Sequence, residues 1–167
     1  ESLEWNLSTK FLKIPKNMSL NKIISPDAII PLMRATNEKS VSLALSKRAG
    51  KIWGLDTSEI ANALFDQDLN AKQRVSMGVA IFHISLPKLE SSHAILARLE
   101  TCVDFTSVDG EPVDLVLLLV TAQSGNNRHL QTLAEVSRLF RDRALCKKLR
   151  GSTTADAMYA LLTDRTD

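Results

Sequence analysis

The feature that most constrains the fold of this chain is a continuous apolar run in its second half. Residues 113–120 read Val-Asp-Leu-Val-Leu-Leu-Leu-Val, without the alternation of apolar and polar side chains that a half-exposed strand shows. A run this continuous is typical of a strand that is covered on both faces of its sheet. It is also far shorter than the roughly 20 apolar residues of a membrane-spanning helix. The run therefore predicts a buried strand inside a layered structure.

Three further strands are expected from short apolar segments. The first covers 28–33, where Pro31 favours a position at the edge of a sheet. The second covers 79–82, and Pro87 follows soon after it. The segment 94–100 fits a strand or a helix equally well. Its continuation through 101–105 has β-like character, so we interpret it as a strand.

Helices are expected between these strands. The apolar periodicity and the turn signals place them at 38–53, 57–70, 130–140, 145–149 and 157–162. Asn37 is a suitable N-cap for the first of them, and Gly54 is a suitable residue to end it. Strands interleaved with helices predict a layered α/β domain.

Length and patterning suggest one domain with an extension. The chain has 167 residues, enough for one domain with a sizeable core. Residues 1–17 have no clear period, and we predict that they form an N-terminal tail or extension outside the core. Residues 18–167 are predicted to form the domain itself.

Composition excludes several classes of function. The net charge of +2 is too close to neutral to indicate nucleic-acid binding. We find no run long enough for membrane insertion and no signal-peptide pattern. The two cysteines, Cys102 and Cys146, lack metal-ligand spacing and favour a reducing compartment over a disulfide scaffold. We therefore expect a cytoplasmic protein.

Two of the three histidines stand where chemistry is usually found. His83 follows the predicted strand at 79–82, and His129 opens a helix after the polar loop 123–127. Strand ends and helix N-termini at one edge of an α/β sheet converge on one crevice, so these two side chains could face each other. A helix N-terminus also favours an anion, which suits a histidine that accepts a phosphoryl group. The alternative is an ordinary histidine at a strand end without a chemical role.

The remaining candidates give weaker signals. His93 lies in a polar segment, and we expect it to be solvated and without a role. No third ligand accompanies the histidines at a recognised spacing, so no metal site is predicted. No motif for a nucleotide or another cofactor is present, and none is expected. A basic cluster is interpreted as a solvated face, with a docking surface for an acidic partner as the alternative: Arg138, Arg141, Arg143, Lys147, Lys148 and Arg150.

Five stretches carry a resemblance to a known family. They are Ile-Ser-Pro-Asp-Ala-Ile-Ile-Pro at 24–31, Gly-Val-Ala-Ile with His83 at 78–83, Val-Asp-Gly-Glu-Pro-Val-Asp-Leu-Val at 108–116, His-Leu with Leu133 at 129–133, and Arg-Leu-Phe-Arg-Asp at 138–142. Over residues 18–163 the chain resembles the enzyme IIA domain of the bacterial phosphoenolpyruvate-dependent phosphotransferase system, fructose/mannitol type. Within that type it is similar to the nitrogen-regulatory branch of alphaproteobacteria.

The resemblance implies a fold and a function. The fold would be a mixed β-sheet flanked by helices in a single layered domain. The protein would be a cytoplasmic phosphocarrier, with His83 as the phospho-acceptor and His129 as a supporting residue. A histidine phosphocarrier protein would be the donor, and proteins of the nitrogen-related branch act as regulators of partner proteins.

The sequence departs from the family pattern near the histidine. At 74–83 the family reads Gly-x-Gly-Asn-Gly-Ile-Ala-Ile-Pro-His, and here two glycines, the asparagine and the proline are replaced by Arg74, Ser76, Met77 and Phe82. A family arginine sixteen positions before the histidine is replaced by Gln67. A neutral amide is a weaker phosphoryl ligand than a guanidinium. Gln67 and Arg74 are nevertheless the candidates for binding the phosphoryl group.

These departures leave two hypotheses open. In the first, the chain is a working phosphocarrier that uses His83. In the second, it is a phosphorylation-impaired regulatory binding module that keeps the enzyme IIA fold and contacts its partner through the rebuilt loop 74–82. An entrance plugged by Phe82 or Arg74 would favour the second.

Overall fold

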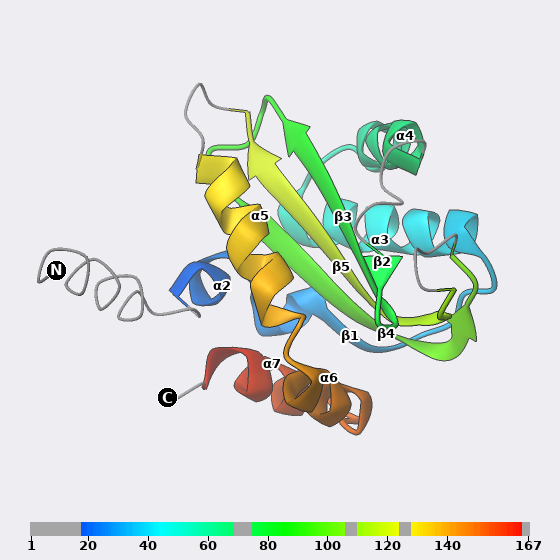
Figure 1. Ribbon diagram of the computed structural model, residues 1–167. Helices are drawn as coiled ribbons and strands as arrows, with labels where there is room; N and C mark the ends of the chain where they lie inside the picture. Colours follow the sequence, from blue (N-terminus) through cyan, green and yellow to red (C-terminus); the bar gives the residue numbers. More distant parts are fainter. Residues whose placement is uncertain (1–17, 69–74, 106–109, 124–127, 165–167) are drawn as a thin grey trace, which may run out of the picture.

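The structure is a computed structural model that describes residues 18–68, 75–105, 110–123 and 128–164. Its centre is a five-stranded mixed sheet in the order β1-β4-β5-β3-β2 (Figure 1). The strands are β1 (Ile29–Met33), β2 (Val75–Ser76), β3 (Val79–Leu86), β4 (His93–Val103) and β5 (Val113–Ala122). The helices are α2 (Met18–Ile23), α3 (Glu38–Trp53), α4 (Thr57–Asp68), α5 (Arg128–Leu139), α6 (Arg143–Arg150) and α7 (Ala155–Thr163), with a 3₁₀ turn at Pro26–Ala28. The predicted α/β class, a mixed sheet flanked by helices, is confirmed.

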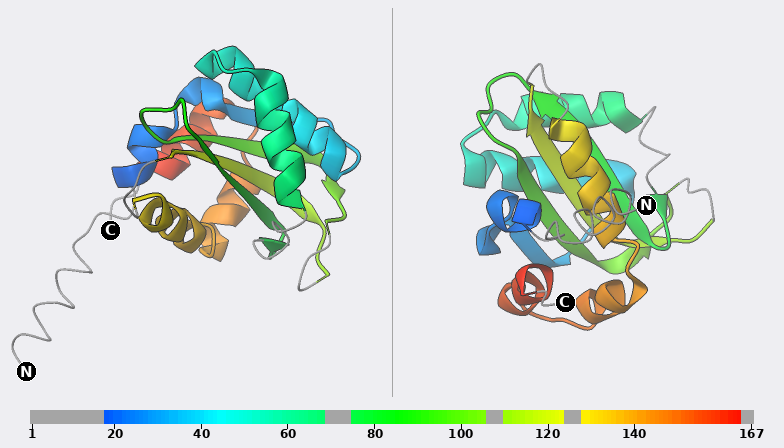
Figure 2. Two further views of the ribbon diagram at one scale, coloured as in Figure 1. Left: turned by 90° about the horizontal axis from the view of Figure 1, so that it is seen from above. Right: turned by 60° about the vertical axis from the view of Figure 1, so that its left-hand side comes forward.

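The apolar run forms β5, which lies between β4 and β3. β5 is antiparallel to β4 and parallel to β3. Every residue from Leu115 to Thr121 is fully buried. Helices α3 and α4 lie over one face of the sheet and α5 over the other (Figure 2). The prediction of a strand covered on both faces is therefore confirmed.

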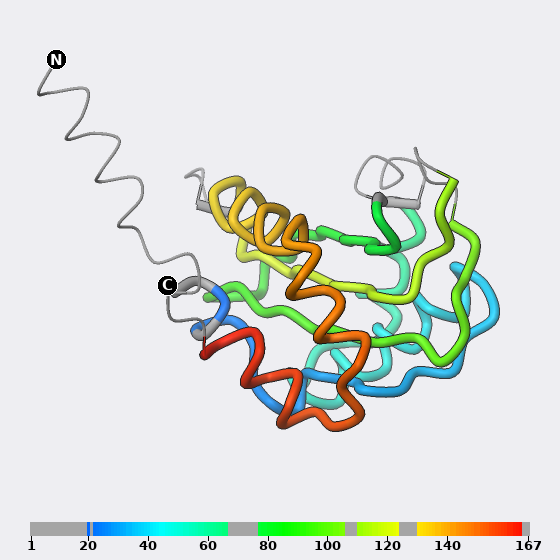
Figure 3. The backbone as a smooth tube through the Cα atoms, turned by 60° about the horizontal axis from the view of Figure 1, so that its bottom comes forward, coloured from blue at the N-terminus to red at the C-terminus, as the bar shows by residue number. Residues whose placement is uncertain are grey.

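Both ends of the described chain meet near the β1 edge of the sheet. Helix α7 contacts α2 and β1, although these elements are more than a hundred residues apart (Figure 3). Strand β1 contains Pro31 and lies at the edge, as predicted. Helix α2 was not foreseen from the sequence. Its Leu20 is buried in the core, so the core extends to this helix.

Local sequence signals set the ends of the helices. The side chain of Asn37 accepts a hydrogen bond from the amide of Ser40 at 2.8 Å, and the Ser40 hydroxyl accepts one from the amide of Asn37 at 3.1 Å. This reciprocal pair satisfies two free amides at the start of α3. Gly54 ends α3 with a φ of +69°, a conformation that suits glycine. Both predicted ends of this helix are confirmed.

The two cysteines are in different surroundings. Cys102 is exposed on β4 and Cys146 is buried in α6, and both are free thiols. Burial raises the pKa of the Cys146 thiol. No described helix is both long enough and apolar enough to span a membrane.

His93 is only partly exposed, which corrects the prediction of a solvated side chain made from its polar neighbours. It opens β4, is half-buried, and its ring centroid lies 5.2 Å from that of Trp53 at the end of α3. Tertiary packing against a helix 40 positions earlier overrides the local polarity of the sequence. Burial lowers the pKa of His93 below its ordinary value of 6.5.

The lowered pKa predicts a loss of stability in acid. As the pH falls through 6.5, the unfolded chain protonates His93 while the folded chain still keeps it neutral. The free energy of unfolding should therefore decrease until the pH is below the folded pKa. In His93→Phe, which keeps a ring beside Trp53, this part of the decrease should be absent. Denaturant unfolding at about pH 7.5 and about pH 5.5 measures the difference, and equal losses in both proteins would contradict the prediction.

Candidate functional site

His83 lies inside a strand and not at its end. The prediction placed the end of the strand at Phe82, but β3 continues to Leu86 because Ile84 to Leu86 keep their register with β5. His83 pairs with Leu119 on β5. Strand β2 pairs only with Val79 and Ala80, so β5 is the only neighbour of His83 among the described strands.

A chain of hydrogen bonds holds the His83 ring. Its Nε2 lies 2.9 Å from Oγ1 of Thr121, which in turn lies 2.9 Å from Oγ of Ser85. The Thr121 hydroxyl also points at the Ile84 carbonyl oxygen at 3.5 Å. His83 and Ser85 share a face because side chains alternate along a strand, and Thr121 is the β5 partner of Ser85. The three side chains therefore form one polar group on this face of the sheet.

Phe82 faces away from this polar group. Alternation along β3 places it on the opposite face, where it is buried and its ring centroid lies 5.9 Å from that of Phe105. Phe82 therefore does not plug an entrance to His83, so this possible argument for the binding module does not apply to Phe82. Phenylalanine at this position fills the core.

The other predicted site residues are not described at the level of side chains. His129 lies in the first turn of α5, which starts beside the carboxyl end of β5 (Figure 1). Gln67 lies in the last turn of α4. The side chains of His129 and Gln67, and all of Arg74, lie outside the described residues. A crevice shared by His83 and His129 therefore remains a prediction.

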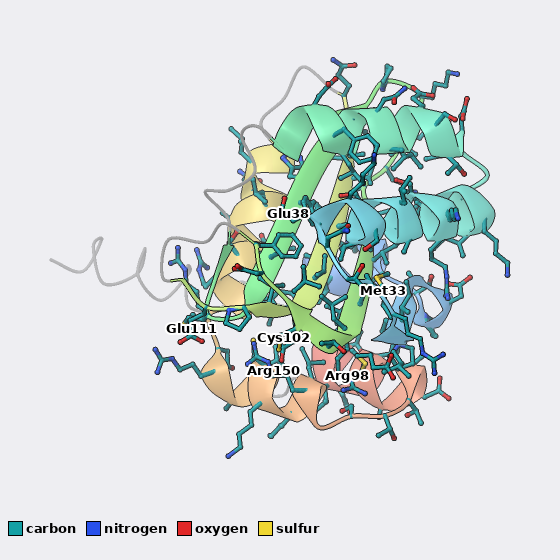
Figure 4. All side chains as sticks on the ribbon, turned by 90° about the vertical axis from the view of Figure 1, so that its right-hand side faces the viewer. Met33, Glu38, Arg98, Cys102, Glu111 and Arg150 are labelled. Carbon is teal, nitrogen blue, oxygen red and sulfur yellow. The ribbon has the colours of Figure 1, made fainter. Side chains whose placement is uncertain are left out.

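The turn that leads into β3 is hydrogen-bonded to helix α6, which comes much later in the chain. Met77 and Gly78 join β2 to β3 with φ values of +53° and +76°, as in a two-residue hairpin turn of type I′. Arg150, which Figure 4 labels, lies at the end of α6. Its Nη2 donates to the Met77 carbonyl oxygen at 2.9 Å. Its Nε contacts both carboxylate oxygens of Asp114, at 2.8 and 2.9 Å. The turn is thus held between α6 and the start of β5.

Arg150 therefore does not belong to the solvated basic face. The other five residues of that cluster are exposed, and none of them forms an ion pair with a described acidic residue: Arg138, Arg141, Arg143, Lys147 and Lys148. The prediction of a solvated face is wrong only for Arg150. Arg150 departs from it because it pairs with Asp114, which is distant in the sequence.

Comparison with known proteins identifies the family. Residues 22–165 match the family model described as "Phosphoenolpyruvate-dependent sugar phosphotransferase system, EIIA 2". The chain belongs to this family. It is also 37% identical over 145 residues to the "Nitrogen regulatory protein" of Bradyrhizobium diazoefficiens, which covers 87% of this chain and 95% of that protein. The EIIA 2 resemblance found in the sequence and its nitrogen-regulatory relationship are confirmed.

Solved structures of EIIA proteins share the fold. The nitrogen regulatory protein IIA-Ntr from Neisseria meningitidis superposes with a TM-score of 0.78 at 21% identity, covering 86% of this chain and 99% of that one. The mannitol enzyme IIA of Escherichia coli, in its complex with phosphorylated enzyme IIB, superposes with a TM-score of 0.68 at 15% identity. It covers 86% of this chain and all of that one. At these identities the likeness concerns the fold alone.

The Arg150–Asp114 pair should stabilise this EIIA domain measurably. The two side chains are 33% and 26% exposed, so the loss of the pair should cost more than an exposed ion pair and less than a buried one. We expect Arg150→Met to lower the free energy of unfolding by about 2 kcal/mol, and the exposed Arg143→Met by less than about 0.5 kcal/mol. Urea denaturation measures both, and equal values would show that the pair contributes nothing.

Met77 stands where the EIIA pattern noted above has asparagine. Because its φ is positive, replacing it by that asparagine should stabilise the fold. Asparagine tolerates the left-handed region better than methionine does. We expect Met77→Asn to raise the free energy of unfolding by about 0.5–1 kcal/mol. The adjacent Gly78→Ala should lower it, because φ is +76° and a Cβ would lie 2.7 Å from Nη2 of Arg150. Thermal unfolding of the two variants measures both effects. If Met77→Asn and Gly78→Ala changed the stability in the same direction, this description of the turn would be contradicted.

Proposed function

We propose that this EIIA domain accepts a phosphoryl group on His83 from a histidine phosphocarrier protein and regulates partner proteins according to its phosphorylation state. The observation that carries the proposal is His83 itself. This half-buried imidazole lies on strand β3 of the family's sheet, where its motif places the histidine of the family pattern. The match to the EIIA family over residues 22–165 supports the same activity.

The chemistry requires an unprotonated ring nitrogen and donors for the phosphoryl oxygens. The nitrogen lone pair of His83 attacks phosphorus in line while the bond between phosphorus and the donor's histidine breaks, and its electron pair stays on the donor's ring. We propose His129, in the first turn of α5, as the supporting residue, because a helix N-terminus favours an anion. Gln67 and Arg74 are the proposed phosphoryl-binding residues. A neutral amide in place of an arginine would weaken binding by about 1.5–3 kcal/mol.

The proposed setting follows from the relatives. The matched family is named for the phosphoenolpyruvate-dependent system, and one solved relative is a complex with a phosphorylated enzyme IIB. We infer a cytoplasmic protein that uses no cofactor and takes its phosphoryl group from the histidine phosphocarrier protein. Residues 18–167 would form the phosphocarrier domain, and residues 1–17 an extension to it.

Two observations favour a second function. Nε2 of His83 is bonded to a fully buried hydroxyl, and the family's arginine is Gln67 in this chain. Both features suit a regulatory binding module that keeps the EIIA fold but is poorly phosphorylated. The domain would then regulate its partner protein by binding to it, without phosphoryl transfer.

Incubation with the phosphocarrier protein separates the two functions. The full chain is mixed with the carrier, which has been charged from phosphoenolpyruvate, and the product is tested for a phosphoryl group that is labile in acid and stable in alkali. The carrier function predicts such a group within the time of the assay. Its absence, with a known EIIA protein labelled in parallel, would favour the binding module.

A further inference from the structure

The hydrogen bond between His83 and Thr121 occupies one of the two ring nitrogens. Oγ1 of Thr121 lies 2.9 Å from Nε2, which is the usual length of a hydrogen bond between nitrogen and oxygen. A ring nitrogen bonds in the plane of the ring, along the direction of its lone pair or its N–H bond. Thr121 therefore stands in the direction from which a phosphorus atom would have to approach Nε2.

The Thr121 hydroxyl is also held firmly. Its side chain is fully buried in β5, in register with Ser85 on β3. Its Oγ1 lies 2.9 Å from the Ser85 hydroxyl and 3.5 Å from the Ile84 carbonyl oxygen. Two strands of one sheet thus fix the hydroxyl, and water cannot readily replace it because the side chain has no exposed surface.

We infer that Thr121 is a positioning residue that withholds Nε2 of His83 from phosphoryl transfer. The inference rests on the proposed function, because it concerns the nitrogen that takes the phosphoryl group. Transfer to Nε2 requires the bond to Thr121 to break first, after which the Nε2 lone pair forms the N–P bond and the leaving group keeps its electron pair. Thr121 therefore lowers the rate at Nε2 by the cost of that bond. A net cost typical of one hydrogen bond corresponds to about fivefold in rate.

The test compares the native chain with Thr121→Val, which removes the hydroxyl and keeps the shape of the side chain. The probe is potassium phosphoramidate, a small phosphoryl donor that loses ammonia when a histidine nitrogen attacks it. Correlated ¹⁵N and ³¹P NMR spectra identify the nitrogen that carries the phosphoryl group and follow the rate at each one. Thr101→Val, on the exposed part of β4, is the matched control.

We expect Thr121→Val to react at Nε2 about five times faster than the native chain and Thr101→Val to react at the native rate. Ser85→Ala, which loosens Thr121 but keeps its hydroxyl, should react at a rate between the two. It provides the same test if Thr121→Val fails to fold. Equal rates at Nε2 in the native chain and in either site variant would overturn the inference, as would no reaction at Nε2 in any of the proteins.

A parallel arm separates this inference from the proposed function. The same variants are incubated with the phosphoenolpyruvate-charged histidine phosphocarrier protein. If phosphoramidate gives the expected rates but the carrier protein labels no variant, the phosphocarrier function fails while the role of Thr121 stands. If the carrier protein labels Nε2 equally in native and Thr121→Val chains, the role of Thr121 fails and the phosphocarrier function stands.

Discussion

His83→Ala should abolish phosphoryl transfer from the charged histidine phosphocarrier protein, with labelling at least about a thousandfold below that of the native chain. Alanine has no nucleophile, and the reaction makes and breaks a bond at this ring. The fold should survive, because His83 is only half-buried and its neighbours Ile81 and Ile84 keep the strand in the core. Acid-labile label and circular dichroism are measured on the same samples.

A second histidine provides the matched control for this variant. His93 is also half-buried at a strand of the same sheet, but it packs against Trp53 and has no place in the proposed site. His93→Gln should retain label at close to the native level. If His83→Ala kept its label, or if both variants lost it, the assignment of the reaction to His83 would be wrong.

Leu117→Ala should cause the largest loss of stability, about 3–4 kcal/mol in the free energy of unfolding. Leu117 is fully buried in the central strand, where it pairs with Ile81 on β3 and Leu96 on β4. Its removal leaves a cavity between elements that cannot move together, because β5 is bonded on both edges. Urea denaturation at neutral pH gives the value.

An exposed leucine serves as the control for the core substitution. Leu32, on the edge strand β1, is 46% exposed. Leu32→Ala should cost less than about 1 kcal/mol, because little apolar surface returns to water. Similar losses in both variants would mean that β5 is not the centre of the core.

Short-range sequence signals were enough to predict most of the fold. The unbroken apolar run of β5, Pro31 in the edge strand, and Asn37 and Gly54 at the ends of α3 each act through neighbours a few residues away. These effects can be judged from a single sequence. Helix α2 was missed because its segment has no strong period, and Leu20 reaches the core only through packing against distant elements.

The candidate site could be predicted only in part. His83 was found from its motif, but Thr121 is 38 positions away and meets it only through the β3–β5 register. Arg150 and Asp114 are likewise 36 positions apart. The sequence pattern assigns Arg150 to a solvated face and indicates no partner for Asp114. Pairings of this kind depend on how strands and helices are brought together in space, which local propensity does not specify.

The central claim is that His83 itself takes the phosphoryl group, and its position in the native chain can be measured directly. Trypsin separates the three histidines into three peptides, with His83 in 75–88, His93 in 89–98 and His129 in 129–138. After labelling by the charged phosphocarrier protein and digestion in mild alkali, mass spectrometry should find the phosphoryl group on peptide 75–88 alone. A phosphoryl group on either of the other two peptides would contradict the claim.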